Sequence, residues 1–461
     1  VHLRVAGAQA TWERPTSELA LLRILAAEPS ARIVAGNTEV GIETKFKHVA
    51  CPFMVSTGAI ASMHVLACDA ACITIGGAVT LASLEHFLHA EIASTMVRVT
   101  RRPTYGTTAA AAAAGAEDGG DLEPHFSMRG AVAMCNMLRW FASTQIRNVA
   151  TLAGNIATAS PISDMNPVLV ALNADVVLAS IDSNGDATER LVSMHDFFLG
   201  YRKTAIAPHE VILRIIVPLT TRFEFVQSYK QARRRDDDIS ITTACMRVGL
   251  EVAPPARDVD GSSRESGASS AWRVHSASLA FGGMGPTTFT ATAAEDALTG
   301  QIWSRDLWSV ACAALQRSVA LPPGVVGGMA AFRTTLAVSF MYKFCIATNI
   351  GLATAHDSAR IECELLGLLA HARGDPAALA VPAAVPLAAR ECVANFFCMH
   401  TLLLLIFFCL LLDRCRLSAS TNFVAAPRSA TFGEQSYPML LAGGLQHGGA
   451  RGVGAVDHAP V

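Results

Sequence analysis

Residues 32–43, "RIVAGNTEVGIE", decide how the rest of this 461-residue chain is interpreted. The apolar run at 33–35 is typical of a buried strand, but residues 36–39 (GNTE) interrupt it before the apolar pattern resumes at Val40. Glycine and asparagine tolerate positive φ, so this interruption can be a simple bend. It can also leave several backbone N–H groups uncovered, which creates a site for an anion such as a diphosphate. This stretch alone does not decide between the two.

A second strip of small and hydroxylated residues lies at 141–167, "FASTQIRNVATLAGNIATASPISDMNP". Such residues let a backbone approach a ligand closely, and their side chains offer donors to phosphate and carbonyl oxygens. A carboxylate at Asp164 could accept hydrogen bonds from sugar hydroxyls. The same residue types also cap helices and form turns, and for either strip alone that interpretation is favoured. The strip consists of Thr151, Gly154, Asn155, Thr158, Ser160, Ser163 and Asp164.

The composition excludes several classes of function. The formal net charge is -2, with 36 basic and 38 acidic residues, so a nucleic-acid partner is not expected. The twelve cysteines are scattered and show no zinc or iron–sulfur spacing, so we expect no metal site. Free thiols in a reducing compartment indicate a cytoplasmic protein, with peroxisomal or membrane-associated locations as alternatives. The chain starts in strand-like sequence without an initiator methionine or a secretory signal, so we expect it to extend further upstream.

From residue 1 to 220, short β-like runs alternate with helical ones, which predicts an α+β fold. Strands are expected at 31–36, 72–77, 174–181 and 210–218. A helix is expected at 16–29, capped by Thr16 or Ser17, and another at 131–146, with Met134, Leu138 and Phe141 on one face. The alanine-rich run 107–121 is expected to be an exposed insertion.

A second block runs from 222 to about 350. It begins with strand-like sequence at 224–250, passes a polar loop at 254–271, and returns to a strand at 276–285. Helices are expected at 305–321 and 330–347, on either side of a Pro-Pro-Gly break. The block is therefore expected to be a sheet packed on helices.

After residue 351 the pattern changes to a tail that is expected to be unstructured or hydrophobic. Residues 352–392 and 424–461 resemble linker or disordered chain. Between them, residues 393–412 carry no charge and are long enough to cross roughly 30 Å of hydrocarbon as a helix. Asn395 and His400 lie inside this run and count against a membrane span. A buried helix or a mis-spliced segment are the alternatives.

Familiar signatures of other enzyme classes are missing from the sequence. There is no G-x-G-x-x-G after a first strand and no Walker A motif, which argues against Rossmann and P-loop folds. There is also no G-x-S-x-G elbow and no H-E-x-x-H motif of the hydrolases and metalloproteases.

Several collinear segments resemble the FAD-binding domain of xanthine dehydrogenases, in the molybdenum hydroxylase family (xanthine dehydrogenase and aldehyde oxidase). The resemblance covers residues 1–347 and is carried by "RIVAGNTEVGIETKFK", "LRWFASTQIRNVATLAGNIATASPISDMNP", "FFLGYRKT", "SYKQARRRDDDISITTACMRV", "LAFGGMGPTT" and "LPPGVVGGMAAFRTTLAVSFMYKF". It implies a two-part flavin-binding domain of the vanillyl-alcohol-oxidase (PCMH) type at 1–220. A smaller α+β domain, similar to the carboxy-terminal domain of the carbon monoxide dehydrogenase flavoprotein, follows at 222–347, and 351–461 form the tail.

The resemblance also implies which residues hold FAD. The first strip would wrap the diphosphate, the second would continue along the cofactor, and Phe141, Ile212 and Lys230 would approach the flavin ring. A cation at Lys230 would favour negative charge on the reduced flavin. No catalytic or metal-ligating residue is implied within this chain. The implied FAD-binding residues are Ile33, Val34, Ala35, Gly36, Asn37, Thr38, Glu39, Val40, Phe141, Thr151, Gly154, Asn155, Thr158, Ser163, Asp164, Ile212 and Lys230.

The implied function is that of a redox module. In similar enzymes, electrons from purine hydroxylation at a molybdopterin centre pass through two 2Fe-2S clusters to FAD and then to NAD. This chain lacks the iron–sulfur cysteine runs and a molybdopterin domain, so we expect those domains in cis or in trans, and the family implies a homodimer.

The electron acceptor is predicted from two short segments. The acidic loop 233–238 (RRRDDD) and the segment 200–204 (GYRKT) resemble the dehydrogenases, which makes NAD the expected acceptor. Mixed charges of this kind are otherwise an ordinary solvated loop. The alternatives are an aldehyde oxidase fragment that is reoxidised by oxygen, and a non-catalytic flavin-binding remnant, either free or tethered to a membrane.

Overall fold

The computed structural model describes residues 1–99, 121–253 and 271–372. Helices and strands are mixed throughout these ranges, which confirms the α+β prediction. Nearly all of the run 107–121 and of the loop 254–271 lies outside the described residues, as does the hydrophobic segment 393–412.

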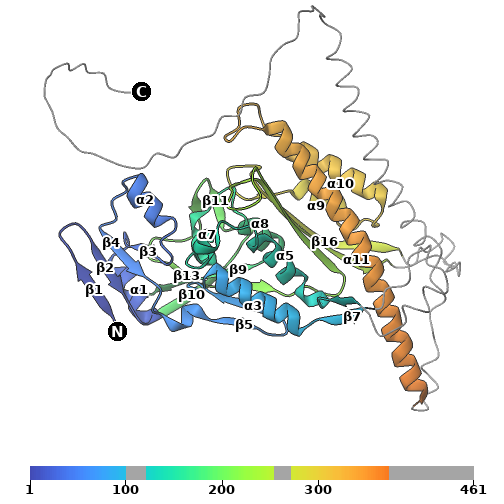
Figure 1. The fold of residues 1–461 in the computed structure, drawn as a ribbon, viewed down its shortest axis with the longest axis horizontal. Helices are drawn as coiled ribbons and strands as arrows, with labels where there is room; N and C mark the ends of the chain where they lie inside the picture. The colour runs from blue at the N-terminus through green and yellow to red at the C-terminus, as the bar shows by residue number, and fades with distance from the viewer. Residues whose placement is uncertain (100–120, 254–270, 373–461) are drawn as a thin grey trace, which may run out of the picture. The chain divides into compact units, whose positions relative to one another are not determined.

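A small sheet near the N-terminus contains the strand that leads into the first strip, residues 36–39 (Figure 1). Helix α1 (Glu18–Ala27) packs its buried leucines against Val55 of this sheet. Ser17 caps the helix, as the sequence predicts, because its hydroxyl accepts a hydrogen bond from the backbone N–H of Ala20 at 3.3 Å. The strand order is β1-β2-β4-β3, with β1 Leu3–Ala6, β2 Thr11–Arg14, β3 Arg32–Val34 and β4 Phe53–Ser56.

A five-stranded antiparallel sheet forms the centre of the first block. Its order is β10-β9-β13-β6-β5, with β5 Leu66–Cys68, β6 Cys72–Gly76, β9 Asp175–Ile181, β10 Ala187–Ser193 and β13 Val211–Pro218. Strands β6, β9 and β13 confirm the strands predicted from the sequence. The helices that share its core are α3 Leu81–Ser94, α5 Arg129–Leu138, α7 Leu152–Thr158 and α8 Met165–Ala171.

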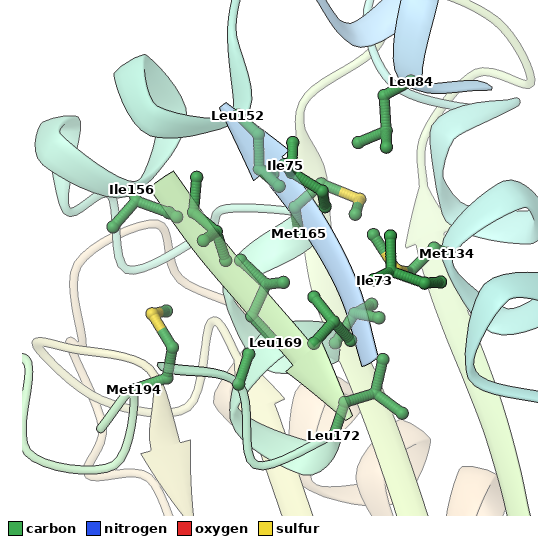
Figure 2. Packing of buried hydrophobic residues seen from close by; sticks show 14 of the residues in the cluster. Ile73, Ile75, Leu84, Met134, Leu152, Ile156, Met165, Leu169, Leu172 and Met194 are labelled. Carbon is green, nitrogen blue, oxygen red and sulfur yellow. The ribbon is translucent and has the colours of Figure 1, made fainter. Parts of the chain in front are cut away.

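The core of this block fixes the second strip. Figure 2 shows Leu152 of α7 beside Ile75 of β6, and Ile156 of α7 and Ile73 of β6 belong to the same buried cluster. All four side chains are at most 1% exposed. The polar side of α7 is therefore held in place by a closely packed apolar side.

The second block contains the third sheet and three helices. The order is β14-β15-β16-β17, with β14 Glu224–Ala232, β15 Ser240–Val252, β16 Trp272–Gly282 and β17 Phe289–Thr290. Helices α9 Thr292–Leu298, α10 Arg305–Ser318 and α11 Ala330–Ala372 belong to this block and share its core (Figure 1). The predicted sheet packed on helices is thus confirmed.

The two blocks share buried side chains. Val226 of β14, Cys245 of β15 and Ala280 of β16 belong to the core of the first block, not to that of their own. Helices α5 and α8 of the first block contact the third sheet directly. The third sheet is therefore buried on the first block as well as on its own helices.

Eight short elements complete the described fold. Helix α2 (Val40–Phe46) follows the first strip, and β11 (Phe198–Gly200) pairs with β12 (Lys203–Thr204) in a hairpin that carries the GYRKT segment. The others are β7 Val97–Val99, which pairs with β8 Asp121–Glu123, helix α6 Thr144–Arg147, and the 3₁₀ turns Ala61–His64 and Phe126–Met128.

The helix predicted over 131–146 was wrong beyond residue 138. Helix α5 ends at Leu138, and a separate short helix begins at Thr144. Between them Ala142 adopts a left-handed conformation with φ of 43°. Arg147 stabilises the break by donating to the Phe141 carbonyl at 2.9 Å. Phe141 therefore lies in a turn and not on a helix face.

The last helix extends further than the sequence indicated. The tail was expected from residue 351, but α11 continues to Ala372. Residues 352–372 are rich in alanine, leucine and glutamate, which favour helices, and the first proline comes only at 376. Among the described residues, the stretch Ala330–Ala353 is the one helix with the length and composition to cross a membrane. Phe340, Met341 and Phe344 of that stretch are buried in the core of the second block, which is typical of a core helix.

Candidate functional site

The two strips meet at Gly36. A Cβ atom at this position would lie 1.8 Å from the carbonyl oxygen of Val149 and 2.8 Å from the nitrogen of Ala150. No side chain fits in that space, so only glycine allows the first strip to touch the backbone that leads into Thr151. The sequence predicts two converging strips, and this contact is where they converge.

The turn after Gly36 exposes backbone donors. Asn37 adopts a positive φ of 59°, and the chain enters α2 at Val40 without a side-chain cap from Glu39. None of the backbone N–H groups of residues 37–40 donates a hydrogen bond to another described residue. Consecutive uncovered amides of this kind are suited to an anion.

The polar side chains of the second strip are mostly used within it. The Thr151 hydroxyl accepts from the Gly154 N–H at 3.0 Å, and the Thr158 hydroxyl donates to the Gly154 carbonyl at 2.8 Å. Ser163 donates to the Asn155 side-chain oxygen at 2.7 Å. The cap-and-turn interpretation is thus right for these hydroxyls, and they give α7 and the following turn a fixed shape.

A third segment, residues 76–81, belongs to the site and was not identified from the sequence. A Cβ at Gly77 would lie 2.2 Å from the carbonyl oxygen of Ile212, and the Leu81 N–H donates to the Ala150 carbonyl at 2.8 Å. This segment therefore joins Ile212 to the point where the two strips meet. The pair of glycines at the end of the predicted strand 72–77 was the signal that could have revealed it.

Lys230 and Asp164 form a buried ion pair. Their side chains are 7% and 10% exposed, and Lys230 Nζ lies 2.6 Å from Asp164 Oδ2. Ser240 donates to the other carboxylate oxygen. Burial raises the pKa of the Asp164 carboxyl, and the Lys230 ammonium and the Ser240 hydroxyl oppose that shift.

This geometry defines the surroundings of both residues. Each Asp164 oxygen already accepts one hydrogen bond within the protein, from Lys230 or from Ser240, and a carboxylate oxygen can accept a further one. The charge of Lys230 is balanced by Asp164, so the lysine contributes a directed N–H donor rather than a net positive charge.

Phe141 lies next to this ion pair. Lys230 Nζ also donates to the carbonyl of Trp140 at 2.6 Å, and Phe141 is partly buried against the core of the first block. The guanidinium groups of Arg139 and Arg235 lie 4.9 Å and 5.4 Å from the Trp140 ring centre. The loop 233–238 is thereby brought to the same place, which sequence spacing alone could not indicate.

A cavity of about 290 Å³ opens at this point. It combines an aromatic ring with charges of both signs, which suits a planar polar ligand. Its lining residues are Arg139, Trp140, Ala142, Ser143, Thr144, Gln145, Arg147 and Asp236.

An ion pair links the first strip to the β11–β12 hairpin. Arg202 donates to the Glu39 carboxylate at 2.8 Å, although the two residues are 163 positions apart in the chain. The GYRKT segment thus contacts the turn with the uncovered amides.

Ile33, another of the implied FAD-binding residues, has a side chain that supports the site from below. Ile33 packs against the small core of the N-terminal sheet, so its side chain supports the strand beneath the turn. Contacts of the implied residues with FAD stay a prediction. Within the described ranges, no cluster of three or more His, Cys, Asp or Glu side chains could hold a metal ion.

The fold and site together define a class of protein. Uncovered amides at a turn, a second strip locked against them, and a buried lysine near an aromatic turn are the elements of a module that binds an extended, phosphate-bearing cofactor. Residues 7–220 match the family described as "FAD binding domain in molybdopterin dehydrogenase", and residues 227–348 match the "CO dehydrogenase flavoprotein C-terminal domain". The chain belongs to the FAD-binding modules of the molybdenum hydroxylases.

Curated relatives share this part of the sequence. The chain is 34% identical to a xanthine dehydrogenase of Dictyostelium discoideum over 348 residues, and 36% identical to a xanthine dehydrogenase/oxidase of Gallus gallus over 359 residues. These matches cover 75% and 78% of this chain but only 23% of each relative. The chain thus spans about a quarter of the length of these relatives.

Solved structures share the fold. A quinoline 2-oxidoreductase chain from Pseudomonas putida 86 matches with a TM-score of 0.54 and 20% identity, over 76% of this chain and 99% of that one. A carbon monoxide dehydrogenase chain from Hydrogenophaga pseudoflava matches with a TM-score of 0.55 and 18% identity, over 75% of this chain and 99% of that one. The two-domain flavoprotein fold predicted from the sequence is therefore confirmed.

Proposed function

We propose that this chain is the FAD-binding redox module of a xanthine dehydrogenase-like molybdenum hydroxylase, with NAD as its electron acceptor. Bound FAD would supply the redox chemistry, taking electrons from iron–sulfur clusters on further domains and giving hydride to NAD. Those domains, and the molybdopterin domain, would be joined in cis or in trans. A homodimer is proposed from the family alone.

The observation that carries the proposal is the contact of Gly36 with Val149. It holds the uncovered amides of 37–40 beside the strip that begins at Thr151. Such amides can bind a diphosphate by donating hydrogen bonds to its oxygens. The turn 37–40 would hold the diphosphate of the cofactor. The strip that begins at Thr151 would hold its central part, and the turn at Trp140 and Phe141 would hold its ring.

Lys230 would orient the ring. Its ammonium is fixed by Asp164 and by the Trp140 carbonyl, so its remaining N–H has one preferred direction. The NAD nicotinamide would approach through the cavity at Trp140, where the loop 233–238 contributes Asp236. That the loop resembles the dehydrogenases supports NAD over oxygen.

The test is a spectrum followed by a turnover assay. Purified protein is expected to release FAD on denaturation and to oxidise NADH with an artificial electron acceptor. A folded protein that neither carries nor takes up flavin would contradict the proposal and indicate a non-catalytic remnant.

The same assay separates a second outcome. Reduced flavin that reacts with oxygen but not with NAD would indicate an aldehyde oxidase-type fragment instead. The choice between purine and aldehyde substrates concerns the domains beyond this chain, so it is tested on the whole enzyme.

A further inference from the structure

The starting point is a negative charge in an unfavourable place. Glu39 lies among the uncovered amides of residues 37–40, immediately before α2. Its side chain makes no cap hydrogen bond to the helix. A carboxylate beside a diphosphate site repels the diphosphate, because the two anions would share one small region.

Arg202 forms an ion pair with Glu39. Its guanidinium lies 2.8 Å from Glu39 Oε1, and the two side chains are 39% and 34% exposed. Glu39 is also the main reason that the pKa of Arg202 is raised above its ordinary value, with Tyr201 adding a smaller contribution.

The hairpin holds Arg202 in a conformation that arginine rarely adopts. Its φ is 53°, at the two-residue turn between β11 and β12. A left-handed residue other than glycine persists only where the surroundings stabilise it. Tight two-residue turns commonly contain a residue with positive φ, so the turn accounts for this conformation, and the ion pair with Glu39 fixes where the guanidinium lies.

We propose that Arg202 is a positioning residue that cancels the charge of Glu39, so that the turn 37–40 can accept a diphosphate. The inference rests on the proposed FAD binding. Arg202 acts through Glu39, so its contribution exists only while Glu39 is charged.

That dependence gives a sharp test with three variants and FAD as the probe. FAD affinity is measured by titrating flavin fluorescence with the apoprotein of the full chain. Arg202→Gln is expected to weaken FAD binding about tenfold, since it leaves Glu39 uncompensated. Glu39→Gln is expected to bind as well as wild type or better, and the double variant Arg202→Gln/Glu39→Gln is expected to return to within about threefold of wild type.

Salt and matched controls exclude a merely structural role. The loss in Arg202→Gln is expected to shrink at high ionic strength, because the repulsion is between partly exposed charges. Arg202→Lys keeps the charge and is expected to retain affinity, which also serves if Arg202→Gln does not fold. Arg273→Gln breaks a similar exposed pair with Glu251, at 2.7 Å and 38% and 45% exposure, and is expected to leave FAD binding unchanged.

Two results would overturn the inference. If the double variant binds FAD as weakly as Arg202→Gln, Arg202 does not act through Glu39. If Arg202→Gln binds as wild type does, the charge of Glu39 has no effect on the diphosphate. Wild-type protein that takes up no FAD overturns the proposed function as well, which distinguishes that failure from the other two.

Discussion

At the scale of single residues, Gly36 shows how the absence of a side chain creates a binding site. The carbonyl of Val149 occupies the space where any other residue would place its Cβ atom. The contact is between two backbones, so no rotamer change can relieve a clash there.

We therefore expect Gly36→Ala to push the two strips apart. The variant should lose about 1–3 kcal/mol of unfolding free energy from overpacking, and its FAD affinity should fall about tenfold or more. Urea denaturation and flavin fluorescence measure the two effects. Gly58→Ala is the control, because a Cβ there would meet only the Ser56 hydroxyl, at 3.6 Å. Equal FAD affinity in both variants would contradict the role given to Gly36.

At the level of single residues, the sequence could reveal only features that are contained in one short segment. The strip 36–39 is readable because small residues interrupt a strand at consecutive positions. The pairing of Lys230 with Asp164 was not predictable, since the two are 66 positions apart and neither segment contains a sign of the other. The hydrogen bonds that the Asp164 oxygens accept come from that distant lysine and from Ser240.

At the scale of elements, the strands were easier to predict than the ends of helices. β6, β9 and β13 are continuous runs of β-branched and other apolar residues, so their burial in a central sheet follows from their pattern. The end of α5 depends on the left-handed Ala142 and on Arg147, which donates to the carbonyls of Phe141 and Ala142 within the break. Alanine is a strong helix former, so the sequence favoured a longer helix.

One interaction between elements should make stability depend on pH. Arg190 of β10 donates to Glu210, which lies just before β13 and also accepts from the Ala207 N–H at 2.7 Å. The hydrogen bond from Arg190 is the main reason that the pKa of Glu210 lies below its ordinary value of 4.5 in the folded protein. The folded state therefore binds this proton less readily than the unfolded state does. The pair stabilises the fold above pH 4.5, and that stability is lost as the pH falls from there through the lowered pKa.

Glu210→Gln should accordingly reduce stability at neutral pH and flatten the acid limb of the stability profile. We expect a loss of about 1–2 kcal/mol at pH 7, because Arg190 is partly exposed and screened. Urea denaturation between pH 3 and 7 measures both features. Glu28→Gln, which removes one exposed carboxylate, is the charge control. A profile parallel to that of wild type would show that the pair does not link these elements.

At the scale of the whole molecule, the class of fold and the family were predictable because several segments match in order. The extent of the last helix was not. Helix α11 buries Leu352 and Ala355 in the core of the second block, beyond the point where the resemblance ends. Local composition could not show whether that part of the chain would find a core to pack against.

This burial predicts where the chain can be cut. A protein ending after Ala372 should unfold with the same midpoint as the full chain and should bind FAD. A protein ending after residue 350 should lose about 2 kcal/mol, since Leu352 and Ala355 no longer fill the core. Thermal and urea unfolding of the three proteins measure this. Equal stability of the two shortened proteins would mean that the end of α11 contributes nothing.

The same set of proteins tests the alternative that residues 393–412 tether the chain to a membrane. If residues 393–412 insert into a bilayer, only the full chain should require detergent for extraction. Full-length protein that remains in the supernatant without detergent would contradict the tether.

Three residues of the third sheet, Val226, Cys245 and Ala280, are buried in the core of the first block. This shared core limits how the two blocks can be exchanged between enzymes during evolution. Two matched families in tandem suggest pieces that could be exchanged between enzymes one at a time. A recombination that replaced only residues 227–348 would place different side chains in the core of the first block, where they would no longer match the residues around them. We expect natural shuffling to have moved both pieces together, as a single inherited cassette.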